Sequence, residues 1–123
     1  MSIPHLCILL AALLPYLTTG LAKTAPGFNN REPRPWLANL RGWQARAYAA
    51  HLNSFEAFPL FAVAVILAEL HHVDGQLLNQ LSGGFVVARV LYIISYISDH
   101  DRIRSVLWLV GIACCIGLLA HAA

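Results

Sequence analysis

The sequence predicts an all-α integral membrane protein: a single domain over residues 1–123, folded as an up-down bundle of four transmembrane helices. Of the 123 residues, 59% are hydrophobic and 11% are charged, whereas ordinary soluble domains are about 45–50% apolar and about 25% charged. The apolar residues form four runs, each long enough to cross about 30 Å of hydrocarbon. Polar segments rich in turn-forming residues separate the runs. A soluble chain of this length could not bury so much apolar surface, so the bilayer is its predicted solvent.

The first predicted helix runs from Ile3 to Ala22, roughly the 20 residues that a membrane crossing needs. A cleaved signal peptide is the alternative. The residues before this run carry no Lys or Arg, and the run is longer than the apolar part of a usual signal peptide. Gly20-Leu21-Ala22 is nevertheless similar to a small-residue cleavage site, so this alternative stays open.

Residues 23–43 are predicted to form a polar loop on the lipid headgroups, ending in a short turn of helix. This segment is rich in proline, glycine, asparagine and arginine, which favour turns over long helices. Trp36 lies within it and Trp43 at its end, as is typical of aromatic residues at a membrane interface.

Three further helices are predicted at about residues 44–72, 76–98 and 103–122. Pro59 is expected to kink the first of these three. Glycines in the other two favour close helix approach. The three cysteines all lie in apolar runs, so they are interpreted as small buried hydrophobic residues rather than as disulfide partners.

No metal site and no nucleic-acid partner are predicted. Adjacent His71 and His72 would point to different sides of a helix, and no third ligand accompanies them. The formal net charge of +2 is small, and the basic residues are not interleaved with aromatic residues as a nucleic-acid-binding surface requires.

Basic residues concentrate in or beside the first connection: Lys23, Arg31, Arg34, Arg41 and Arg46. Because cytoplasmic loops carry an excess of Lys and Arg, the first and third connections are predicted to face the cytoplasm. With four spans, both termini then lie on the opposite side of the membrane.

Ionisable residues inside a membrane are costly and are therefore functional candidates. On the second predicted helix, Arg46, Asn53 and Glu56 fall within an arc of about 80°, so they share one face. On the third, an arginine and two tyrosines at positions i, i+3 and i+7 also share a face: Arg89, Tyr92 and Tyr96. Up-down topology brings both sets to the predicted cytoplasmic end.

The fourth predicted helix adds Arg104 and Ser105 at the same membrane level. Arginines bind carboxylates through paired N–H groups, and Glu56 could receive an ammonium group. This combination suits a small zwitterionic ligand with two carboxylates. The alternative from the residues alone is structural: Glu56 pairs with Arg46 or Arg89 and holds the helices together.

Three motifs resemble those of the MAPEG family, the membrane-associated proteins of eicosanoid and glutathione metabolism. The pattern Asn-x-x-Glu-x-x-Pro stands at Asn53, Glu56 and Pro59, as in the family's second helix. An arginine followed by aromatics three and seven positions later, beginning at Arg89, is similar to its third helix. The segment from Arg104 to Trp108 is similar to the start of its fourth helix, so the resemblance covers essentially the whole chain.

The resemblance implies a homotrimer that binds glutathione between neighbouring subunits near the cytoplasmic face. The glutathione-binding residues implied are Arg46, Asn53, Glu56, Arg89, Tyr92, Tyr96 and Arg104. Arg104 would stabilise the thiolate, because a nearby guanidinium raises the thiolate fraction, and Ser105 would be a weaker catalytic candidate as a hydroxyl donor. The implied function is a glutathione transferase or peroxidase acting on hydrophobic electrophiles or lipid hydroperoxides that arrive through membrane lipids. The chain is most similar to bacterial members, which implies an inner-membrane location with periplasmic termini.

Two positions depart from the family pattern. Ala49 stands where eicosanoid-metabolising members often carry an arginine, so Arg46 would have to reach in its place, and Trp108 stands where an aromatic residue with a hydroxyl is common. We therefore favour an enzyme and keep a non-enzymatic lipid-binding or accessory protein as the alternative. A proton-coupled exporter is disfavoured because the first predicted helix lacks the interior carboxylate that such proteins need.

Overall fold

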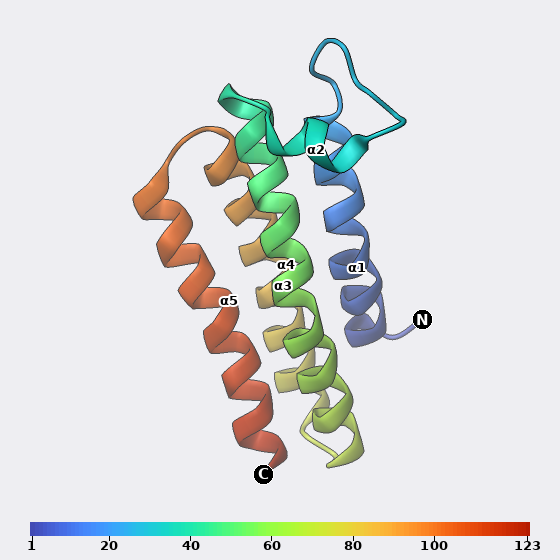
Figure 1. Ribbon diagram of the computed structural model, residues 1–123. Helices are drawn as coiled ribbons and strands as arrows, with labels where there is room; N and C mark the ends of the chain where they lie inside the picture. Colours follow the sequence, from blue (N-terminus) through green and yellow to red (C-terminus); the bar gives the residue numbers. More distant parts are fainter.

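The computed structural model describes residues 1–123 and confirms the predicted all-α architecture, with no β-strand. Four long helices run up and down side by side, and a short fifth helix lies in the first connection (Figure 1). The helices are α1 (Ile3–Ala22), α2 (Pro33–Ala38), α3 (Gly42–Leu70), α4 (Gly75–Ile97) and α5 (Asp101–Ala122). Each long helix begins and ends within two residues of its predicted limits.

All four long helices have the length and apolar composition needed to span a bilayer. Large apolar side chains remain exposed along them, among them Leu17 (67%), Ile94 (56%) and Leu109 (59%). In water this much exposed apolar surface would drive aggregation, whereas in a bilayer it contacts lipid tails. The chain is therefore a multi-pass membrane protein.

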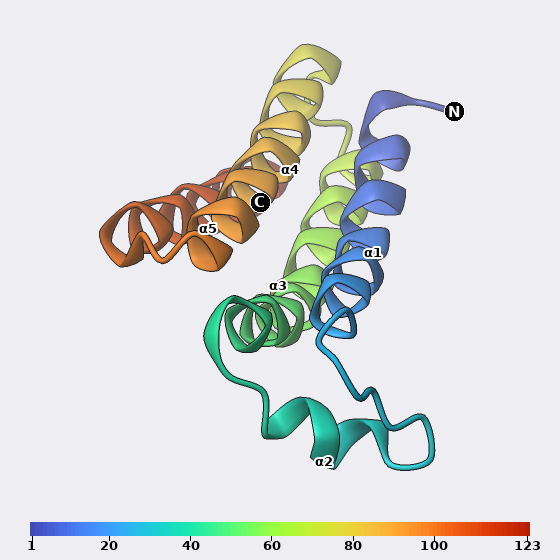
Figure 2. The same ribbon diagram turned by 90° about the horizontal axis from the view of Figure 1, so that it is seen from above.

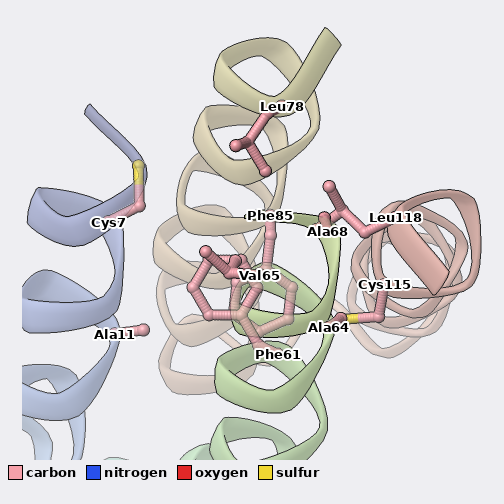
Figure 3. Packing of buried hydrophobic residues seen from close by; sticks show 10 residues of the cluster. All are labelled: Cys7, Ala11, Phe61, Ala64, Val65, Ala68, Leu78, Phe85, Cys115 and Leu118. Atoms are coloured by element: carbon pink, nitrogen blue, oxygen red, sulfur yellow. The ribbon is translucent and has the colours of Figure 1, made fainter. Parts of the chain in front are cut away.

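The core lies between α3 and α4 and receives side chains from the two outer long helices (Figure 3). Phe61 and Phe85 stack at its centre, with their rings 4.0 Å apart between centroids and tilted by 7°. Cys7 of α1 and Cys115 of α5 reach this core as buried free thiols, as predicted. The first helix is thus packed into the bundle.

The turn between α3 and α4 explains why α3 ends two residues before the predicted limit. His72 adopts a left-handed backbone conformation (φ 56°), and the N–H of Val73 donates to the carbonyl of Ala68 at 3.0 Å. This hydrogen bond is typical of a helix-terminating motif that is usually made with glycine. Asp74 then caps α4, because its carboxylate accepts a hydrogen bond from the N–H of Leu77 at 3.2 Å.

The turn between α4 and α5 has the same construction and positions the start of α5. Asp99 is left-handed (φ 65°), and the N–H of His100 donates to the carbonyl of Ser95 at 2.8 Å. Asp101 begins α5 two residues earlier than predicted, and its negative charge suits the positive end of the helix dipole. This tight reversal holds the end of α4 beside the first turns of α5.

Helix α2 lies at the same end of the bundle as the α4–α5 turn, to one side of the long helices (Figures 1 and 2). Pro33 opens it, at a position where a missing N–H costs nothing. Leu37 is buried against Ala22 and Ala47, which fixes α2 on the adjoining ends of α1 and α3. The predicted polar loop therefore contains one anchored helical turn.

Gly111 marks a close approach of α5 to α4. A Cβ added there would lie 3.7 Å from the side-chain carbons of Arg89 and Phe85, which is ordinary van der Waals contact. We expect Gly111→Ala to keep or raise stability, since alanine favours a helix by about 1 kcal/mol. Gly111→Leu should lower stability by about 1–3 kcal/mol through overpacking. Thermal unfolding in detergent measures both variants, and a leucine variant as stable as the alanine variant would show that this contact is not tight.

Candidate functional site

The polar residues predicted to act together lie on α3, α4 and α5, between the middle of these helices and the end of the bundle that carries α2 and the α4–α5 turn. Helices α3, α4 and α5 each contribute side chains there. Two recesses adjoin at this end: one between α4 and α5, the other between α3 and α5. These are the places where the predicted residues meet a surface that a ligand could reach.

The first recess has a volume of about 240 Å³ and is lined by Tyr92, Tyr96, Arg104, Ser105 and Trp108. The guanidinium carbon of Arg104 lies 4.3 Å from the ring centroid of Tyr96, within the range of a cation–π contact. The one contact in the chain between a basic side chain and a carboxylate joins Nε2 of His5 to Glu69 at 2.9 Å, far from this recess. No carboxylate of the chain neutralises Arg104, so its charge is available to an anion.

The second recess has a volume of about 220 Å³ and is lined by Asn53, Glu56, Ala57, Leu60, Trp108 and Ile112. Its polar part is the exposed carboxylate of Glu56, which makes no ion pair within the chain, with the half-buried amide of Asn53. The remaining wall is apolar. This recess therefore offers a negative charge beside an apolar surface.

Arg89 reaches this site only through an aromatic neighbour. It is 3% exposed and lines neither recess, and its guanidinium carbon lies 4.0 Å from the ring centroid of Tyr92. The Tyr92 and Tyr96 rings meet edge to face, with centroids 5.8 Å apart and planes at 86°. The two arginines and the two tyrosines thus form a continuous row from the core to the recess. Arg89 packs on Tyr92, Tyr92 on Tyr96, and Tyr96 on Arg104. Nη2 of Arg89 and Oδ1 of Asn53 are buried without a hydrogen-bond partner.

Arg46, also predicted to bind the ligand, lies outside both recesses. Its Nε donates a hydrogen bond of 3.0 Å to the carbonyl of Ile97, the last residue of α4. A cation at the C-terminal end of a helix is stabilised by the helix dipole. The structure therefore gives Arg46 a role in joining the ends of α3 and α4.

His51 lies on the side of α3 opposite to Asn53 and Glu56, facing α1. Its Nδ1 is 2.7 Å from the carbonyl of Pro15 in α1, to which it donates a hydrogen bond, and its ring stacks on Tyr48 with centroids 5.9 Å apart. This residue faces a different neighbour from Asn53 and Glu56, and it belongs to the α1–α3 contact.

The sequence analysis did not identify the apolar lining of the second recess. Ala57 and Leu60 follow Asn53 at i+4 and i+7, while Trp108 and Ile112 follow Arg104 at i+4 and i+8. Helical spacing places each pair on the face of its polar predecessor. Extending the polar faces by one or two turns would have made these residues candidates, although it would not have distinguished them from residues that face lipid.

The chemistry of the combined recesses follows from their charges. Arg104 can hold an anionic sulfur or carboxylate, Glu56 can accept an ammonium group, and Ser105 and the tyrosines can donate hydrogen bonds. The apolar wall offers a surface on which a hydrophobic molecule could pack. No group of three or more potential metal ligands is close enough together to hold a metal ion.

In a comparison with models of protein families, the MAPEG family model matches residues 3–123. No curated protein and no solved structure matches the chain. The family match spans all four membrane-spanning helices and both recesses. The chain therefore belongs to the MAPEG family.

Proposed function

We propose that this protein is a glutathione-dependent membrane transferase or peroxidase. It would activate the glutathione thiolate for attack on hydrophobic electrophiles or lipid hydroperoxides that enter from the bilayer. Family membership supports the use of glutathione, which MAPEG proteins generally share. One observation carries the proposal. Arg104, which has no carboxylate partner, lines one recess, and the free carboxylate of Glu56 lines the other, with Trp108 as the wall common to both.

In this proposal glutathione lies across both recesses. Its sulfur is next to Arg104, whose positive charge favours the thiolate and so increases the amount of nucleophile at neutral pH. Ser105 donates a hydrogen bond to the same sulfur. The γ-glutamyl ammonium group contacts Glu56, and Asn53 orients the peptide by hydrogen bonding. Arg89 holds Tyr92 in place from inside the bundle.

The active assembly in this proposal is a homotrimer with glutathione between neighbouring subunits. Both recesses lie at the surface of one chain, and among the recess residues only Arg104 is positively charged, although glutathione has two carboxylates. A neighbouring subunit would supply the second cation. The proposed location is the bacterial inner membrane with periplasmic termini, because Lys23, Arg31, Arg34 and Arg41 all lie at the end of the bundle that carries the site.

One observation favours a second candidate, a non-enzymatic lipid-binding or accessory protein of the same fold. Arg46 would have to compensate for the arginine that is absent at position 49, yet its Nε is engaged by the carbonyl of Ile97. The site then has one cation fewer for the carboxylates of glutathione. Folded protein that fails to bind glutathione at millimolar concentration would support this second candidate.

Calorimetric titration of the purified protein in detergent tests the proposal. We expect wild-type protein to bind glutathione and Glu56→Gln to bind it about 10- to 100-fold more weakly, the cost of losing a charge-assisted hydrogen bond. Glu69→Gln is the matched control, because it removes a carboxylate that lies 13 residues further along the same helix, lines neither recess and has His5 as its one hydrogen-bond partner. Equal weakening in the two variants would contradict a specific role of Glu56.

A modified ligand sharpens this test. Glutathione lacking its α-amino group should bind wild-type protein and Glu56→Gln with the same affinity, because the group that Glu56 contacts is gone. If Glu56→Gln weakens both ligands to the same extent, then Glu56 does not receive the ammonium group.

A further inference from the structure

Trp108 is the one side chain that lines both recesses. It follows Arg104 by four residues, so one helical turn places both on the same face of α5. Its side chain is 40% exposed. The indole therefore stands between the recess that holds Arg104 and the largely apolar recess between α3 and α5.

The apolar side of this wall is accessible from lipid. Ala57, Leu60 and Ile112 line the recess beside the indole. Leu60, in this lining, is 38% exposed, and Leu109, the residue after Trp108, is 59% exposed. A hydrophobic molecule dissolved in the bilayer could thus reach the indole without crossing a polar surface.

The chemistry of indole distinguishes between classes of acceptor. It presents the largest aromatic face among the side chains, so a flat conjugated ring stacks on it more favourably than a flexible aliphatic chain does. Its only polar group is an N–H donor, and it carries no hydroxyl. It cannot supply a proton to a departing oxygen as an acidic hydroxyl could.

We propose that Trp108 determines acceptor specificity and selects planar, π-conjugated electrophiles such as activated aryl halides. This inference rests on the proposed function. The thiolate attacks the ring carbon that carries the halogen, a C–S bond forms, and the C–halogen bond breaks. The halide leaves with its electron pair and requires no proton. Reduction of a hydroperoxide instead breaks an O–O bond and leaves an alkoxide that must be protonated, which the indole does not assist.

Binding of glutathione conjugates tests this selection without turnover. Calorimetry should show that wild-type protein binds S-(2,4-dinitrophenyl)glutathione more tightly than S-hexylglutathione. Trp108→Leu should reduce this preference by about 3- to 10-fold, the expected loss of aromatic stacking, and Trp108→Phe should keep most of it. Trp43→Leu is the matched control, because Trp43 is exposed to the same extent (39%) but lines neither recess.

Turnover provides the second measurement. Trp108→Leu should lower kcat/KM for 1-chloro-2,4-dinitrobenzene by about 10-fold and change that for a saturated alkyl hydroperoxide by no more than about twofold. An unchanged preference for the aryl conjugate in Trp108→Leu would overturn the role of Trp108 while glutathione binding continues to support the proposed function. If folded wild-type protein binds neither glutathione nor its conjugates, the proposed function fails and this inference fails with it.

Discussion

Replacing Arg104 with alanine is expected to lower glutathione-dependent turnover by about 10²- to 10³-fold, the usual effect of removing one group that stabilises a reacting anion. The half-buried guanidinium contacts the Tyr96 ring and has no carboxylate partner within the chain. Because the guanidinium is half-buried, water screens its charge less than that of a fully exposed arginine, which strengthens its attraction for an anion. Steady-state kinetics on protein of unchanged oligomeric size measures the loss.

Arg102→Ala is the matched control for this prediction. Arg102 has the same charge and lies in the same turn of α5, but it is exposed and lines neither recess. It should leave turnover within about twofold of wild type, since surface charges away from a site have small effects. If Arg104→Ala is as active as Arg102→Ala at neutral pH, Arg104 has no catalytic role.

The pH profile separates thiolate stabilisation from simple binding. An unassisted thiol has a pKa of about 8.5, so turnover by Arg104→Ala should rise about tenfold for each pH unit below that value. Wild-type turnover should be flatter over the same range because the thiolate is already formed. Parallel profiles in the two proteins would mean that Arg104 contributes to binding alone.

The four spans were predictable because membrane-spanning length and apolar composition are properties of the chain itself. The exact residues at which the helices end were less predictable. His72 and Asp99 terminate α3 and α4 in a left-handed conformation that usually calls for glycine. Neither position carries the glycine that usually marks such a helix end, so the predicted ends were off by one or two residues.

The sequence predicts which polar residues share a helix face, but not how deeply each of them is buried. Helical spacing fixes which residues share a face, yet it does not fix how far that face turns toward the core. Arg89 and Tyr96 lie on the same predicted face, but Arg89 is buried and Tyr96 lines a recess. The carbonyl partner of Arg46 also lies outside any spacing rule, because it is a main-chain atom of another helix.

The apolar wall of the site was missed for a reason particular to membranes. Residues such as Leu60 and Ile112 look the same in sequence whether they face lipid or a substrate recess. Ionisable residues stand out against an apolar background, whereas apolar site residues do not. Only the packing of α5 against α3 distinguishes them.

Phe61→Ala should produce the largest loss of stability in the chain, about 2–4 kcal/mol. Phe61 is fully buried, and its ring stacks on Phe85 at the centre of the core (Figure 3). In a membrane protein, removing a buried ring forfeits packing contacts and leaves a cavity, while the gain from hiding apolar surface is small because lipid is itself apolar. The cost is therefore expected to be somewhat smaller than the roughly 3–5 kcal/mol typical of soluble cores. Thermal unfolding in detergent measures it.

Val63→Ala provides the control, since Val63 is on the same helix and 51% exposed to lipid. It should change the unfolding temperature little, and Phe61→Leu should fall between the two because it leaves a smaller cavity. Phe85 also lies beside Gly111, the close contact between α4 and α5. A loosened core should therefore shift α5, and with it Arg104, so that glutathione binding weakens along with stability. Equal unfolding temperatures for Phe61→Ala and Val63→Ala would mean that lipid packing rather than this aromatic pair holds the helices together.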